Sequence, residues 1–153
     1  MKLRTIYQKA IKKATEEDPR SRKLMRSRID ALAKEYKKLK GIDKKSFDSG
    51  RLSHPYDDSK ILFGTGEEEI KTVMVGIDID VAEILLADRL REKGKSIDLV
   101  VSHHPSGRGL MQLDKVMDIQ PVFWESFGLS GEVAGKIMKK RMDEVARGLS
   151  GIN

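Results

Sequence analysis

The chain of 153 residues has no cysteine, few aromatic residues and no long hydrophobic run. Without cysteine it can form no disulfide framework, no thiolate metal site and no cysteine nucleophile. Aromatic residues make up only 5% of the sequence, so Ile, Leu, Val, Met and Ala must build the core. No apolar run approaches the ~18 residues needed to span a bilayer. The amino terminus also lacks the apolar stretch of a signal peptide. We therefore expect a cytoplasmic protein that does not bind a membrane.

Positive charge is concentrated at the amino-terminal end. The whole chain has a formal net charge of +6. Residues 1–45 contain 16 Lys or Arg and 6 Asp or Glu, whereas the rest of the chain contains 14 and 18. Such asymmetry is found in proteins that bind nucleic acid. It is also found in lysine-rich helices that simply face solvent, which is the interpretation we favour.

The basic region predicts two amphipathic helices. Apolar residues at intervals of three and four predict the first helix over 3–17. The second follows Asp18-Pro19, where Asp would be the N-cap and Pro the first helical residue, and it should end near Gly41. Together, these two predicted helices would form a basic helical hairpin. We expect this hairpin to form one domain, 1–45, ahead of a second domain over 46–153.

The segment after the hairpin carries few structural signals. Residues 42–59 are polar and predict an ordered loop or linker. His54 lies within it, and an isolated loop histidine is more commonly a surface residue than a metal ligand. Residues 60–64 predict a short edge strand. The glycine-containing turn after that strand lacks the Lys and Ser/Thr of a phosphate-binding loop.

The middle of the chain has the pattern of a βαβ unit. Residues 72–78 and 97–102 predict two strands, the second of them buried and apolar on both faces, and residues 81–93 between them predict an amphipathic helix. A crossover of this kind makes the two strands parallel neighbours, so their carboxyl ends meet at one sheet edge. Ligands bind at that edge in open α/β folds.

The pattern after the second strand is helical. A short helix or loop is expected over 110–118, followed by helices over 119–127 and 130–147. The predicted fold class is therefore α/β, a parallel βαβ-containing sheet flanked by helices and preceded by an α-helical hairpin. A doubly wound sheet normally continues with another strand where this chain stops. We therefore expect the 153 residues to be a fragment or a naturally short form.

The second strand ends in two adjacent histidines, His103 and His104, followed by Pro105. Where a strand ends the backbone turns, so neighbouring imidazoles can converge on one pocket. Imidazole is the commonest metal-ligating side chain, and in a two-metal site each histidine could hold one ion. Arg108, in the same loop, could bind an anionic substrate group. Alternatively, the two histidines only cap the strand and bond to loop backbone.

Two aspartates should lie at the same edge. Asp78 and Asp80 follow the first strand and are carboxylate candidates for a metal site. Asp80 also occupies the N-cap position of the helix over 81–93, and we favour that role. No catalytic residue is identified from the sequence.

These motifs resemble the amino-terminal half of the NIF-three-like family, also called the GTP cyclohydrolase I type-two-like family. The similarity covers roughly residues 60–153, and its most specific part is the hydrophobic strand ending in His103-His104-Pro105. The length of the basic hairpin is also similar to that of one bacterial and archaeal branch. The resemblance implies an α/β fold, a dinuclear site for divalent metal ions (zinc, iron, manganese or nickel) and a homo-oligomer.

The resemblance makes His103 and His104 metal ligands and gives no ligand role to Asp78 or Asp80. The family's other ligands are an aspartate in a later loop and a histidine and a glutamate near the carboxyl end. No positions in this chain match them. The resemblance therefore implies half of a metal site, with metal binding weak or absent in this short chain.

Two classes of function follow. In the first, the protein is related to a metal-dependent, cyclohydrolase-like hydrolase, and Arg108 orients an anionic group. In the second, it is a non-catalytic regulatory or interaction protein whose hairpin contacts a protein, an acidic partner or nucleic acid, or packs against a neighbouring subunit. The cations expected near the hairpin turn are Lys12, Lys13, Arg20, Arg22, Lys23, Arg26 and Arg28. The hairpin has no helix-turn-helix spacing and no interleaved aromatic residues, which disfavours nucleic acid.

Overall fold

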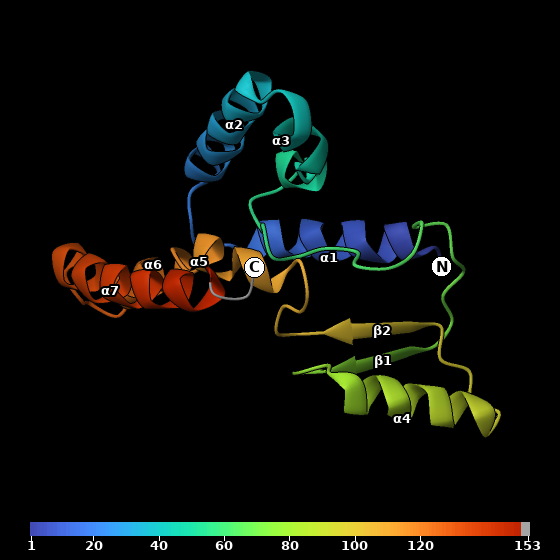
Figure 1. The fold of residues 1–153 in the computed structure, drawn as a ribbon. Helices are drawn as coiled ribbons and strands as arrows, with labels where there is room; N and C mark the ends of the chain where they lie inside the picture. The colour runs from blue at the N-terminus through green and yellow to red at the C-terminus, as the bar shows by residue number, and fades with distance from the viewer. Residues whose placement is uncertain (151–153) are drawn as a thin grey trace. The chain divides into compact units, whose positions relative to one another are not determined.

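The computed structural model describes residues 1–150, which form a mixed helix and strand structure (Figure 1). The helices are α1 (Leu3–Glu17), α2 (Arg22–Lys38), α3 (Gly41–Ser46), α4 (Val81–Glu92), α5 (Leu113–Val116), α6 (Ile119–Ser126) and α7 (Gly131–Ser150). The strands are β1 (Val73–Gly76) and β2 (Leu99–Ser102). There are also two short 3-10 helices, η1 (Ser49–Leu52) and η2 (Leu110–Gln112). Within these described residues, no helix combines the length and the apolar character needed to cross a membrane.

The chain divides into two compact units that are each discontinuous in sequence. Unit 1 comprises Met1–Glu16 and Ile61–Leu110. Unit 2 comprises Glu17–Lys60 and the described residues from Met111 onward. These boundaries differ from the expected division into 1–45 and 46–153. Because α1 belongs to unit 1 and α2 to unit 2, the two basic helices do not form a compact unit of their own.

Unit 1 contains the βαβ motif that the sequence predicts. β1 and β2 are parallel neighbours, with Val73 paired to Leu99 and Gly76 paired to Ser102. At their amino ends the Asp98 carboxylate accepts backbone N–H groups from Lys71 and Thr72 at 2.9 and 2.8 Å. These bonds hold the pKa of Asp98 below its ordinary value. The parallel arrangement of the two strands is therefore confirmed.

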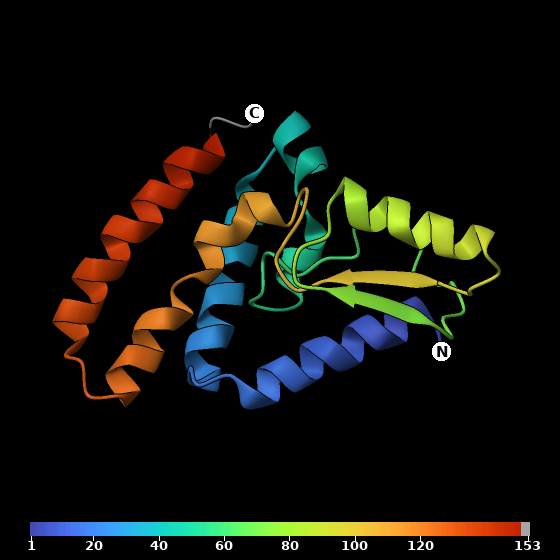
Figure 2. The same ribbon diagram turned by 90° about the horizontal axis from the view of Figure 1, so that it is seen from below.

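The amino terminus belongs structurally to the segment before β1. Lys2 forms an isolated antiparallel bridge with Glu69, and the N–H of Ile70 donates to the carbonyl of Met1 at 2.8 Å. Leu3 and Ile70 are buried beside this bridge. The two strands lie between α1 and α4 in both views (Figures 1 and 2). Unit 1 is thus layered as helix, sheet and helix.

The expected strand over 60–64 is wrong, because this segment has no strand structure. Phe63 is 97% exposed and has no ladder to join. Instead, the Glu68 carboxylate accepts the N–H groups of Thr65 and Gly66 at 2.7 and 2.9 Å, which closes a tight turn. These backbone hydrogen bonds, the one from Thr65 foremost, lower the pKa of Glu68 to about 2.

The start of α2 also differs from the expectation. The N-cap is Ser21, whose side chain accepts the N–H of Leu24 at 3.2 Å. Asp18 does not cap the helix, because Arg20 binds both of its carboxylate oxygens. The helix ends at Lys38, before the expected stop at Gly41.

Unit 2 is largely helical. The segment over 42–59, expected to be an ordered loop or linker, contains α3 and η1 across half of its length, so that expectation is wrong in its detail. α6 and α5 both pack on α7, where Ala134 and Met138 are buried. α7 continues to Ser150 rather than ending before Gly148 as expected.

Candidate functional site

The backbone places the two histidines at the carboxyl edge of the sheet. The N–H of His103 donates to the carbonyl of Gly76 at 2.9 Å, and the N–H of His104 donates to the carbonyl of Ile77 at 2.8 Å. These two bonds fix the backbone of both histidines against the end of β1 and the residue after it. His103 and His104 are both exposed, as the sequence predicts for residues at this edge.

The side chains of the pair are close to each other and to a carboxylate. The imidazole centroids of His103 and His104 lie 5.2 Å apart, with the rings inclined at 29°. Nδ1 of His104 lies 2.8 Å from Oδ1 of Asp78, and these side chains are 58% and 73% exposed. Because an ionised carboxylate only accepts hydrogen bonds, we assign the proton to Nδ1. The lone pair of His104 is then on Nε2 and is available to a ligand.

Short contacts hold the two loops of this edge together. The Ser102 hydroxyl lies within hydrogen-bonding distance of the carbonyls of Ile77 and His104, at 3.3 and 2.5 Å. The backbone packs tightly here, because a Cβ at Gly76 would lie 3.1 Å from the carbonyl oxygen of Asp78 and 2.7 Å from Cδ1 of Ile79, which would have to move. The close approach of these loops brings Asp78 within reach of His104.

The other predicted residues of this edge behave differently. Asp80 is the N-cap of α4, and its N–H donates to the Glu83 carboxylate at 2.9 Å in a capping box. The favoured capping role of Asp80 is therefore confirmed. Arg108 is exposed on the turn after Gly107, whose φ is +50°. Across residues 1–150, no hydrogen bond or ion pair joins Arg108 to either histidine.

The donor set fits part of a metal site. Within the described residues, no group of three His, Asp or Glu side chains is arranged to hold a metal ion. His103 and His104 supply two imidazoles, and Asp78 binds the ring of one of them. The residues thus fit a pair of ligands with an orienting carboxylate, and any further ligand has to come from elsewhere.

The third histidine lies in unit 2. His54 is only 5% exposed, so the expectation of a surface loop residue is wrong. Its Nδ1 accepts the N–H of Tyr56 at 3.2 Å. Burial lowers the pKa of His54 below its ordinary value, so the ring is neutral at pH 7. A neutral buried ring is a structural part of this unit.

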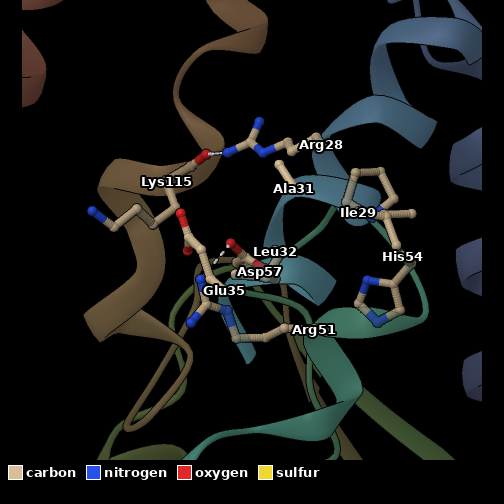
Figure 3. Close-up of a pocket in the computed structure, with 10 residues that line it drawn as sticks. Arg28, Ile29, Ala31, Leu32, Glu35, Arg51, His54, Asp57 and Lys115 are labelled. Atoms are coloured by element: carbon tan, nitrogen blue, oxygen red, sulfur yellow. Dashed lines mark hydrogen bonds and ion pairs between the residues drawn. The ribbon is translucent and has the colours of Figure 1, made fainter. Parts of the chain in front are cut away.

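His54 is also part of the wall of a pocket of about 300 Å³ within unit 2 (Figure 3). The lining residues are Arg28, Ile29, Ala31, Leu32, Glu35, Arg51, His54, Pro55, Asp57 and Lys115. The guanidinium of Arg51 is paired with Asp57 at 3.1 Å. Figure 3 shows the ammonium of Lys115 pointing away from the other labelled side chains. The sequence shows no motif for this pocket, because its walls come from three separate segments.

Some of the cations expected to contact nucleic acid are bound within unit 2. Asp118 pairs with both Arg20 and Arg28. Arg20 is also paired with Asp18 at 2.7 Å, and both of these side chains are almost fully buried. The structure therefore removes Arg20 from the set of residues that could contact a phosphate backbone.

Comparison of the chain with protein-family models, with curated proteins and with solved structures finds no match.

Proposed function

We propose that this chain is a NIF-three-like metal-binding protein and that His103 and His104 are two imidazole ligands of a divalent metal site. The observation that carries the proposal is the 2.8 Å contact between Nδ1 of His104 and the Asp78 carboxylate. Metal-ligating histidines almost always donate their second ring N–H to a carboxylate, a carbonyl or water. Such a bond fixes the tautomer and makes the other nitrogen more basic.

The surroundings of the pair support the same role. Both residues are exposed at the carboxyl edge of a parallel sheet, so an ion and its remaining ligands can approach. Imidazole ligands suit zinc, iron, nickel and related ions. In a complete site, such an ion would lower the pKa of a bound water and polarise a substrate bond, which is the chemistry of a hydrolase. Arg108 would bind an anionic substrate group on the loop that follows the pair.

The proposal is tested by titrating the purified chain with Zn²⁺ in a calorimeter. The variant His103→Ala/His104→Ala should lose the binding that the parent shows. A control variant, Lys93→Ala/Lys95→Ala, changes two exposed residues at the opposite end of the βαβ unit and should bind as the parent does. Equal binding by the parent and the double histidine variant would show that the pair is not a metal site.

A further inference from the structure

Unit 1 leaves an unusually large part of its apolar surface uncovered. β1 exposes Val73 and Val75, the latter at 69%. α4 exposes Val81, Ile84, Leu85 and Leu86, each by half or more. Parallel sheets normally have both faces covered, and two-stranded sheets are marginal by themselves. This apolar surface is therefore expected to be covered by another protein surface.

The backbone of β1 is also open on one side. The carbonyl of Thr72 accepts the N–H of Leu99 and the carbonyl of Gly76 accepts the N–H of His103, so both carbonyls point towards β2. Alternate residues of a strand point their backbone groups in opposite directions, so those of Val73 and Val75 point away from β2. In the described part of the chain, β1 pairs only with β2. An open edge of this kind can form hydrogen bonds with a strand from another chain.

We propose that β1 pairs with β1 of a second copy of the chain, antiparallel, in a dimer with two-fold symmetry. A register centred on Met74 places Val73 of each copy opposite Val75 of the other. These residues point their backbone N–H and C=O groups across the new edge, so each pair can exchange hydrogen bonds. The result is a four-stranded sheet, within the usual range of sheet size.

Charge complementarity favours a second copy in this antiparallel direction. β1 itself carries no charge. Lys71 precedes it and Asp78 follows it, and both are exposed. Antiparallel pairing brings the Lys71 end of one copy beside the Asp78 end of the other. Parallel pairing would instead bring like charges together at both ends, which is unfavourable.

α4 belongs to the same interface. A two-fold axis perpendicular to the sheet keeps α4 of both copies on one face, next to the new strand pair. Relative to the buried Ala87, Ile84 lies on one flank of this helix and Leu86 on the other, so an apolar flank meets the second copy in either case. A two-fold interface uses each such residue twice, which doubles the apolar area that it buries.

The test measures the molar mass of the full chain by sedimentation equilibrium over a range of concentrations. The parent should be a dimer. Val75→Pro removes the outward N–H of the edge without touching the β1–β2 ladder, and it should weaken association by about tenfold or more. The matched control Val75→Thr keeps the N–H and a β-branched side chain, so it should remain a dimer. Ile84→Glu/Leu86→Glu, which places a charge on each flank of α4, should weaken association without altering the strand.

Circular dichroism shows whether each variant keeps the helix content of the parent. If Val75→Pro fails to fold, Ile84→Glu/Leu86→Glu still decides the question. A monomeric parent would overturn the proposal and would indicate that this apolar surface is covered within one chain. A dimer that survives both Val75→Pro and Ile84→Glu/Leu86→Glu would overturn it as well, because association would then use a different surface.

Discussion

Asp78 Oδ1 lies 2.8 Å from Nδ1 of His104, although the two residues are 26 positions apart in the chain. Each follows a strand of the same parallel pair, so the pairing of β1 with β2 brings them together. The bond leaves Nε2 of His104 available to a ligand. This relationship gives the histidine pair an orientation, which two adjacent histidines in a sequence do not have by themselves.

Replacing the Asp78 carboxylate should weaken metal binding without removing a ligand. Asp78→Asn keeps the shape of the side chain but no longer presents an anionic acceptor to Nδ1 of His104. Loss of such an orienting partner typically costs about 10–100-fold in metal affinity. The measurement is Zn²⁺ titration by calorimetry. Asp80→Asn is the matched control, since Asn is as good an N-cap as Asp. Equal losses in the two variants would contradict the positioning role.

The histidine pair should contribute little to stability. His103 and His104 are both exposed, and a substitution at such a position usually changes the free energy of unfolding by less than about 0.5 kcal/mol. His103→Ala/His104→Ala should therefore unfold in urea, without metal, close to the parent. A markedly lower midpoint would show that the pair is structural and that its role is to cap the strand.

The ion pair of Asp18 and Arg20 should matter far more. Their side chains are 1% and 4% exposed and lie 2.7 Å apart. Burial by itself would raise the pKa of Asp18, but its hydrogen bonds from Arg20 outweigh this and lower the pKa. Removing one partner of a buried pair costs about 3–5 kcal/mol, so Asp18→Ala should be strongly destabilised in urea unfolding.

The matched control for that variant is Glu16→Gln, which removes an exposed carboxylate paired with Lys12 at 3.9 Å. Exposed pairs contribute at most about 1 kcal/mol. If Asp18→Ala and Glu16→Gln unfold at similar urea concentrations, the buried pair does not stabilise unit 2.

Burial of His54 should make the protein less stable in mild acid. The pKa of this ring is lowered in the folded state, so the unfolded chain binds a proton at a higher pH than the folded one. As the pH falls below about 6.5, stability is lost by up to about 1.4 kcal/mol per pH unit until the folded ring is also protonated.

His54→Asn isolates this effect, because an amide oxygen can still accept the N–H of Tyr56 but does not titrate. The other ionisable groups are common to both proteins. Urea unfolding at pH 7 and pH 5.5 measures the stability of both proteins. Between these two pH values the parent should lose more stability than the variant. A difference independent of pH would mean that His54 is protonated with the same affinity in both states.

Nucleic acid should bind weakly and without sequence preference. Arg20 and Arg28 are already paired with carboxylates, which reduces the charge available to phosphates. Affinity for a DNA duplex should fall by about 0.9 log units per log unit of salt for each phosphate contacted. Fluorescence anisotropy with two unrelated duplexes at several salt concentrations measures both properties. Tight and selective binding at physiological salt would favour the interaction role for the basic segment.

The sequence alone determined the elements whose signals are local. The apolar runs before Asp78 and His103, with an amphipathic helix between them, are sufficient for the βαβ unit. The same is true of the Asp80 capping position, because a cap and its helix are neighbours in the chain. Local hydrogen bonds and side-chain periodicity act over a few residues, so a sequence displays them directly.

Tertiary structure decided everything that depends on a distant partner. The segment over 60–64 has strand-forming residues but no strand beside it, so it turns. Asp18 is a good N-cap by type, but the Tyr56 hydroxyl, 38 positions along the chain, donates to one of its carboxylate oxygens. His54 is buried because separate segments close around it. The bond between Asp78 and His104 exists only once β1 and β2 are paired. Contacts such as these form between groups that are far apart in the sequence and meet only in the folded chain, so local sequence patterns do not predict them.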